Sequence, residues 1–196
     1  MHHLRWSALL VITLMLACTK PPAFNSTDLT GTEIGSAGHA QTLTDHTGKP
    51  RKLSDFQGKV VVIFFGYTQC PDVCPTVLTK MREVMSLLGS DAEKVQVVFM
   101  SIDPERDTQA LLAQYVPAFH PSFLGVFGDA NVTATVAKDF KIFYQKSPGT
   151  TPGSYTMDHS SGSYVIDAKG KLRLYLKHED TAPQIAQDLK RLLAGN

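Results

Sequence analysis

The distribution of hydrophobic residues along the chain predicts a largely buried β-sheet. Residues 59–67, 95–102 and 123–127 are mostly β-branched or aromatic, which is typical of strands covered on both faces. Residues 163–167 and 171–176 flank the turn Ala-Lys-Gly and predict an antiparallel hairpin. Because buried parallel strands and a hairpin occur together, the sheet is expected to be mixed.

Helices are predicted between these strands. Apolar residues recur at helical spacing, or capping residues open the segment, in four places: 75–88, 108–115, 130–140 and 183–193. Residues typical of helix ends follow the first two segments, namely Gly89 after 75–88 and Pro117 after 108–115. Residues typical of helix starts precede or open the others: Asp107 or Thr108 for the second, Asp129 for the third and Pro183 for the fourth. Residues 146–162, rich in Ser, Thr, Gly and Pro, are predicted to form a long loop.

The order of these elements indicates an α/β fold in three layers around the mixed sheet. Residues 42–55 place Asp-His-Thr-Gly-Lys-Pro between short alternating segments and predict an N-terminal β-hairpin. The arrangement resembles a thioredoxin-like domain into which one strand and one helix have been inserted.

The N-terminus resembles an export signal. The uncharged run 6–17 has 12 residues, which is short of the ~20 needed to span a bilayer but suits a signal-peptide core. The run ends in Leu-Met-Leu-Ala and is followed by Cys18, similar to a bacterial lipoprotein cleavage box; a buried free cysteine is the alternative. We therefore expect a signal peptide in 1–17, a lipid-anchored flexible tether in 18–40 and one folded domain in 41–196.

Composition and charge exclude several classes of protein. The chain has 196 residues, with 19 Lys and Arg against 18 Asp and Glu, so it lacks the basic excess that nucleic-acid binding requires. Removing 1–17 takes away Arg5 and leaves a net charge of zero, so membrane attachment would depend on the lipid. Three cysteines are too few for a disulfide scaffold. The cysteines of the domain are therefore candidates for chemistry in an oxidising, extracytoplasmic compartment.

Cys70 and Cys74 occur where the first buried strand meets the first long helix. A spacing of four places both sulfurs on one side of the first turn, where the helix N-terminus favours the thiolate. Asp72 is expected to cap the helix or to interact with the helix dipole rather than to bind metal. A structural disulfide would close too small a loop to stabilise much, which leaves thiol–disulfide exchange and soft-metal binding. Tyr67 and Pro71, three residues before each cysteine, are not the Thr of a peroxidase of related fold.

His159 is the expected third donor. In a thioredoxin-like topology, the loop that enters strand 163–167 packs against the start of the cysteine-bearing helix. Asp158 either orients the His159 ring or is a solvated loop acid, and Met157 is expected to pack rather than to bind metal. Residues 103–108 are expected to form a turn and helix cap that support the site, with partner docking as the alternative. The other histidines outside the signal are expected to be surface or core residues: His39, His46, His120 and His178.

Three motifs resemble the signatures of the Sco/SenC family. They are Tyr67-Thr68-Gln69-Cys70-Pro71-Asp72-Val73-Cys74-Pro75, Asp103-Pro104-Glu105-Arg106-Asp107-Thr108 and Tyr155-Thr156-Met157-Asp158-His159-Ser160. The resemblance covers 41–194. Gln69 stands where members often carry His, but this position is not a ligand. The family is often anchored by a transmembrane helix, whereas this chain carries the predicted lipidation site.

The resemblance implies a copper-binding protein that helps to assemble the CuA centre of cytochrome c oxidase, with Cys70, Cys74 and His159 as ligands. Two thiolates and one imidazole suit Cu(I) and hold Cu(II) with another donor, although zinc with a water molecule also fits. The expected partners are the oxidase subunit that carries CuA, other copper chaperones and thiol reductants. We expect a metallochaperone rather than an enzyme, located as a lipoprotein at the periplasmic face of a bacterial membrane. The alternatives are a thiol–disulfide oxidoreductase that keeps partner cysteines reduced, and a copper sensor or storage protein.

Overall fold

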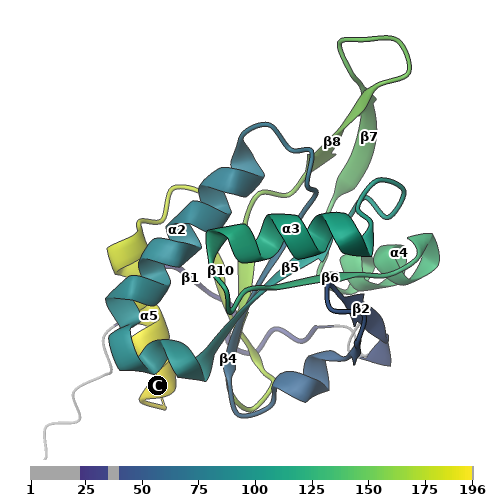
Figure 1. The fold of residues 1–196 in the computed structure, drawn as a ribbon. Coiled ribbons are helices and arrows are strands. Elements are labelled where there is room, and N and C mark those ends of the chain that lie inside the picture. The colour runs from purple at the N-terminus through teal and green to yellow at the C-terminus, as the bar shows by residue number, and fades with distance from the viewer. Residues whose placement is uncertain (1–22, 35–39, 196) are drawn as a thin grey trace, which may run out of the picture.

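A mixed β-sheet forms the centre of the molecule. The computed structural model describes residues 23–34 and 40–195, and within them eight strands form one sheet in the order β1-β10-β9-β4-β5-β6-β2-β3 (Figure 1). The parallel core of this sheet consists of β4 (Val60–Gly66), β5 (Val95–Ser101) and β6 (Leu124–Phe127). Every residue of β4 is buried, as its continuous hydrophobic run predicts.

Two antiparallel hairpins extend the sheet on either side of this core and confirm the sequence prediction. The first, β2 (Leu43–Asp45) and β3 (Pro50–Arg51), pairs with β6. The buried Asp45 carboxylate holds its turn by accepting hydrogen bonds from the backbone of Thr47 and Lys49. The second hairpin is formed by β9 (Ser163–Ile166) and β10 (Leu172–Leu176), and β9 pairs antiparallel with β4.

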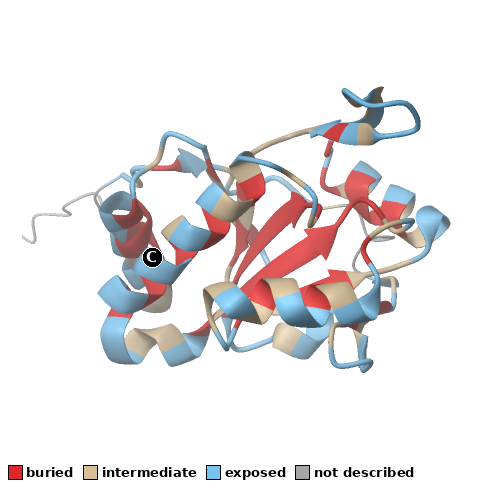
Figure 2. Ribbon diagram, turned by 45° about the horizontal axis from the view of Figure 1, so that its top comes forward, coloured by how far each residue is buried: buried red, intermediate tan, exposed pale blue. Residues whose placement is uncertain are grey.

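Helices cover both faces of the sheet, which makes the fold the three-layer, thioredoxin-like α/β arrangement that the sequence predicts. On one face, Phe99 of β5 contacts Tyr115 of a helix; on the other, Phe65 of β4 contacts Phe140. Figure 2 shows the buried strands enclosed by helices whose outer faces are exposed. The first face is covered by α2 (Val73–Leu88), α3 (Gln109–Phe119) and α5 (Ala182–Leu193), and the second face is covered by α4 (Ala130–Asp139). Two 3₁₀ helices, η1 (Leu53–Phe56) and η2 (Gly89–Lys94), lie in the connections.

The helices differ from the predicted ranges by a few residues at their ends; α2, for example, begins at Val73. Pro117 lies inside α3, which continues to Phe119, so this proline does not end the helix as predicted. Asp72 occupies the N-cap position of α2, as expected, but its side chain makes no capping hydrogen bond, which leaves the interaction of its charge with the helix dipole. The predicted caps at Thr108 and Asp129 are confirmed, because each side chain accepts a hydrogen bond from the first turn of its helix.

The predicted long loop contains a second, two-stranded sheet. Strand β7 (Tyr144–Pro148) pairs antiparallel with β8 (Tyr155–His159), and the resulting hairpin projects from the domain (Figure 1). Most of its side chains are exposed or only partly buried, so the hydrophobic alternation that identifies a strand is weak here. The Ser, Thr, Gly and Pro residues of 146–162 are therefore the stronger signal, and this is why the sequence predicts a loop.

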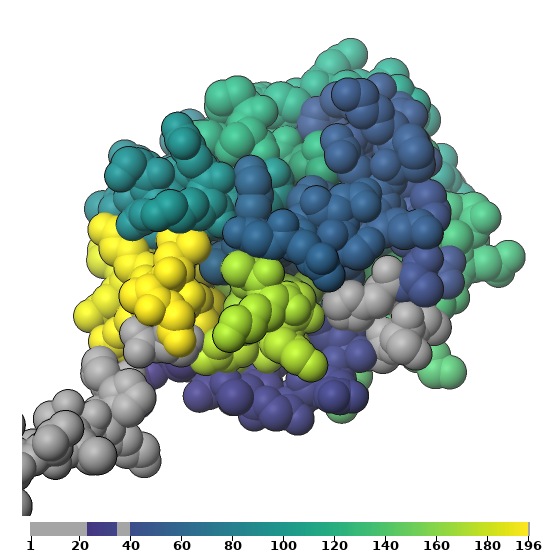
Figure 3. Space-filling model, turned by 90° about the horizontal axis from the view of Figure 1, so that it is seen from below, coloured from purple at the N-terminus to yellow at the C-terminus, as the bar shows by residue number. Residues whose placement is uncertain are grey.

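Residues 24–34 pack on the domain rather than forming part of a flexible tether that extends to residue 40. Strand β1 (Thr27–Asp28) pairs with β10, and the backbone N–H of Ser26 donates to the buried Asp188 carboxylate at 2.8 Å. Figure 3 shows this purple segment against the yellow-green turn of the β9–β10 hairpin. Its hydrophobic residues follow no regular spacing, so the sequence does not predict a strand here. The strand forms because β10 and α5, which are distant in sequence, supply its hydrogen-bond partners. The predicted signal peptide 1–17 and Cys18 lie outside the described residues.

Candidate metal centre

The two cysteines follow the end of strand β4. Cys74 lies in the first turn of α2, whereas Cys70 lies in the loop before the helix, so the two residues do not share the first turn as their spacing predicts. The Cys74 side chain is 0% exposed and lies against Gly66, the last residue of β4. A Cβ atom at residue 66 would lie 2.8 Å from Cys74 Sγ, so only glycine permits this approach of the sulfur to the strand. Sequence reasoning missed Gly66, although a glycine inside a buried strand is a signal of close packing.

His159 meets the cysteines from the far end of the chain. Its Nε2 lies 3.9 Å from Cys74 Sγ, and the ligand atoms of Cys70, Cys74 and His159 all lie within 4.8 Å of one another. Nδ1 lies 2.8 Å from the carbonyl oxygen of Ser160. Because a carbonyl only accepts, Nδ1 donates to it, and Nε2 is the ring nitrogen that faces the sulfurs. Tyr67 contacts the imidazole edge-on, with 5.9 Å between ring centroids.

The two thiols have opposite electrostatic environments. Cys70 is half-buried, and its sulfur accepts hydrogen bonds from the Cys74 side chain and from the backbone N–H of Asp72 and Cys74. Donation by the Cys74 thiol is the main cause that lowers the pKa of Cys70, to about 3. The same hydrogen bond raises the pKa of Cys74, and burial raises it further. In the metal-free, reduced site, Cys70 is therefore a thiolate and Cys74 a neutral thiol.

Alkylation is expected to distinguish the two thiols. Because the pKa of Cys70 is lowered to about 3, its thiolate persists above that pH and is lost only as the pH falls through 3. Its rate of reaction with iodoacetamide should therefore change little between pH 5 and 8, while buried Cys74 stays unmodified. Mass spectrometry of peptides from the reduced protein measures both rates. A Cys70 rate that rises about tenfold per pH unit, as for an ordinary thiol, would contradict the assignment.

The neighbours of His159 have structural contacts of their own. Asp158 is exposed and accepts a hydrogen bond from Ser147 Oγ at 2.6 Å, so it does not orient the imidazole and corresponds to the solvated alternative. Met157 is buried, which confirms that it packs. Neither residue therefore belongs to the donor set in this structure.

The remaining histidines do not join the site. His46 Nδ1 accepts from the backbone of Gly125, His120 Nδ1 contacts Ser122, and His178 is exposed. His39 lies outside the described residues. Among the described residues, the group of donors that could hold a metal ion is therefore the two cysteines and His159.

The segment 103–108 supports the loop of residues 67–72, which joins β4 to α2 and carries Cys70, as predicted; we call it the cysteine loop. The buried Asp107 carboxylate accepts hydrogen bonds from Thr68 Oγ1 and Ser101 Oγ, both at 2.6 Å, and also from the backbone of Thr68. Burial raises the pKa of Asp107. Arg106 contacts Gln69 on the cysteine loop and Tyr155 on β8, a link that sequence reasoning missed because the three residues come from separate motifs.

Comparison with known proteins identifies related chains. The SCO1/SenC family profile matches residues 30–194. The mitochondrial SCO2 homolog of Mus musculus is 37% identical over 156 residues, which are 79% of this chain and 61% of that protein; the chain thus spans about three fifths of this relative.

Solved structures are also similar. Bradyrhizobium japonicum ScoI, determined with copper bound, is 41% identical with a TM-score of 0.72, over 77% of this chain and 96% of that chain. A SCO1/SenC family lipoprotein of Bacillus anthracis is 27% identical with a TM-score of 0.68, over 78% and 92% of the two chains. Within the described part of this chain, none of the helices has the length and hydrophobicity needed to cross a membrane.

Proposed function

Because this chain belongs to the SCO1/SenC family, we propose that it binds copper through Cys70, Cys74 and His159 and delivers it to the CuA centre of cytochrome c oxidase. The observation that carries the proposal is the convergence of two sulfurs and one imidazole nitrogen within 4.8 Å. The copper-bound ScoI structure supports the choice of metal, because that protein is similar over 77% of this chain.

The donor chemistry supports copper as the cargo. Thiolates are soft ligands that favour Cu(I), and the Nε2 lone pair of His159 completes a three-coordinate site. Two thiolates give the site a net charge of −1 with Cu(I) and zero with Cu(II), so neither ion is grossly disfavoured. Binding needs both thiols, so a Cys70–Cys74 disulfide must first receive two electrons from a thiol reductant, which is itself oxidised to a disulfide. Cys74 loses its proton when the metal binds.

A transfer experiment tests this function. The reduced, Cu(I)-loaded chain is mixed with the apo form of an oxidase domain that carries the CuA ligands, and copper is measured on each protein after separation. We expect copper to move to the oxidase domain by exchange of thiolate ligands, without a change in oxidation state. Copper that stays on this chain would favour the sensor or storage alternative, and failure of the reduced chain to bind Cu(I) would refute the proposal.

A thiol–disulfide reductase is the second candidate. The pairing of a half-buried Cys70 thiolate with a buried Cys74 thiol supports it, because the first sulfur is the attacking nucleophile and the second can resolve the mixed disulfide. His159→Ala separates the candidates. If the variant reduces a partner disulfide as the parent does and its copper affinity is also unchanged, the chaperone proposal fails and the reductase is favoured.

Membrane attachment is proposed to depend on a lipid at Cys18, facing the periplasm. The Leu-Met-Leu-Ala-Cys sequence supports this, as does the description of the Bacillus anthracis relative as a lipoprotein. Mass spectrometry of the membrane-extracted protein should find a chain that begins at a diacylated Cys18. The Cys18→Ser variant should lose this modification and leave the membrane fraction. An unmodified Cys18 in the extracted protein would refute the anchor.

A further inference from the structure

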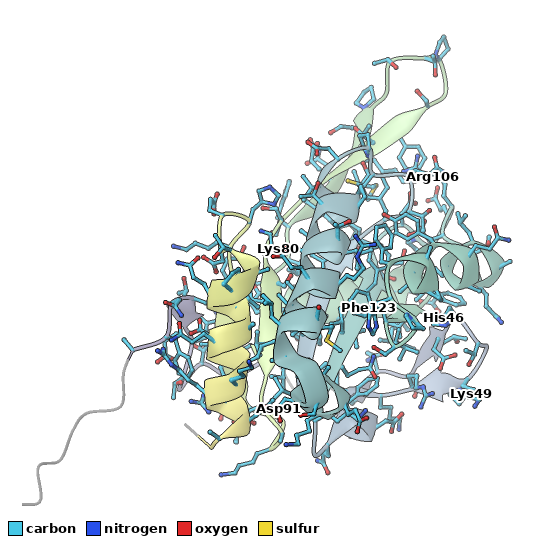
Figure 4. All side chains as sticks on the ribbon, turned by 60° about the vertical axis from the view of Figure 1, so that its left-hand side comes forward. His46, Lys49, Lys80, Asp91, Arg106 and Phe123 are labelled. Carbon is cyan, nitrogen blue, oxygen red and sulfur yellow. The ribbon has the colours of Figure 1, made fainter. Side chains whose placement is uncertain are left out.

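Arg106 connects the cysteine loop to the strand that carries the histidine. Its Nη1 donates to the carbonyl oxygen of Tyr155 at 2.8 Å and to Gln69 Oε1 at 3.3 Å. The guanidinium carbon lies 3.5 Å from the centroid of the Tyr155 ring, a cation–π contact. Figure 4 shows Arg106 at the base of the projecting hairpin, where these elements meet.

Asp103 fixes both partners of this contact. Its carboxylate is 1% exposed; Oδ2 accepts from Arg106 Nε, and Oδ1 accepts from the Tyr155 hydroxyl at 2.8 Å. Charge-assisted hydrogen bonds of this kind are stronger than neutral ones. Tyr155 is consequently held at its carbonyl, its ring face and its hydroxyl, so the first residue of β8 has little freedom to move relative to the cysteine loop.

The β7–β8 hairpin depends on such contacts. A two-stranded sheet is marginally stable by itself, and β7 and β8 pair with each other rather than with the eight-stranded sheet in the described part of the chain. His159 is the last residue of β8, four positions after Tyr155. The position of β8 therefore sets the distance between His159 Nε2 and Cys74 Sγ.

We propose that Arg106 is a positioning residue for metal binding: its clamp on Tyr155 holds β8 where His159 faces the two sulfurs. Arg106 itself makes no contact with the three donor atoms; it acts through Tyr155 and Gln69. The inference rests on the proposed copper-binding function. Lysine cannot replace Arg106, because a single ammonium group lacks the planar fork that reaches Asp103, Gln69 and Tyr155 together.

The test compares Arg106→Lys with Arg173→Lys. Arg173 is a matched control, because its side chain is also 18% exposed, pairs with an aspartate and lies near an aromatic ring, while it belongs to β10. We expect Arg106→Lys to lower Cu(II) affinity about 10- to 100-fold, the range for residues that orient metal ligands, and Arg173→Lys to leave it unchanged. In the metal-free protein, amide hydrogen exchange of β8 should be faster in Arg106→Lys alone. Equal copper affinities for the two variants would overturn the inference.

A double variant separates positioning from general damage to the fold. If Arg106 acts through His159, adding Arg106→Lys to His159→Ala should produce no further loss of Cu(II) affinity. Tyr155→Leu, which removes the ring and hydroxyl contacts but keeps the backbone carbonyl, should reproduce part of the single Arg106→Lys loss. A full additional loss in the double variant would contradict positioning. If His159→Ala by itself leaves copper affinity unchanged, the proposed function fails instead, so the two failures are distinguishable.

Discussion

Replacing Cys70 with serine is expected to abolish tight copper binding. The substitution removes one of two soft thiolates and leaves a neutral hydroxyl, which is a poor ligand for Cu(I). We expect the affinity for Cu(I) to fall on the order of a thousandfold, about 4 kcal/mol at 1.4 kcal/mol per factor of ten. Competition with a Cu(I) chelator under reducing conditions measures the change.

Cys70 is the better of the two thiols for this experiment. It is half-buried, whereas a hydroxyl at the fully buried Cys74 would lie against Gly66 and disturb packing as well as ligation. Thermal unfolding of the metal-free Cys70→Ser protein should therefore resemble that of the parent. The control is Cys18→Ser, which removes the one cysteine outside the donor set and should retain the full affinity for Cu(I). Retention of parental affinity by Cys70→Ser would show that copper is bound elsewhere.

His159→Ala is expected to affect Cu(II) more strongly than Cu(I). Cu(I) is held adequately by two thiolates, so loss of the imidazole should lower its affinity only about tenfold. Cu(II) prefers four donors that include nitrogen, so its affinity should fall by at least about a hundredfold. Titration of the protein with each ion in competition with a chelator gives both values, with Cu(I) measured under reducing conditions.

The control for this variant is His178→Ala, because His178 is an exposed histidine beyond strand β10. Its removal should change neither affinity. Equal losses for both ions in His159→Ala would indicate that the substitution disturbs the cysteine loop rather than removing a ligand. Absence of any loss would refute the three-donor site.

The sequence predicted the centre of the fold because each central element carries its own local signal. The run 59–67 is hydrophobic at almost every position and became β4, and the helical spacing of 75–88 became the body of α2. The two cysteines at this junction follow directly from the order of strand and helix. Local patterns are sufficient here, because burial on both faces of a strand imposes a composition that few other structures share.

The sequence could predict the approach of His159 only through an expected topology. The residue is 85 positions from Cys74, and its strand β8 has no hydrophobic alternation strong enough to be recognised. The pattern therefore predicts a loop where the structure has a hairpin, although the expected topology correctly brings His159 towards the cysteines. The sequence allows two partners for Asp158, the His159 ring or solvent, and in the structure its carboxylate accepts a hydrogen bond from Ser147.

The order of the elements and the place of the two cysteines beside a helix start can thus be read from local sequence patterns, and an expected topology adds His159 as the candidate third donor. The close approach of the donors becomes visible in the folded chain: Gly66 makes room for Cys74, and Arg106 connects Tyr155 to the cysteine loop. The folded chain also shows that residues 24–34 join the sheet and α5. The spacing of hydrophobic residues shows which face of a segment is buried and which is exposed. These contacts instead join segments that are distant in sequence, and such pairings produce no regular spacing within either segment.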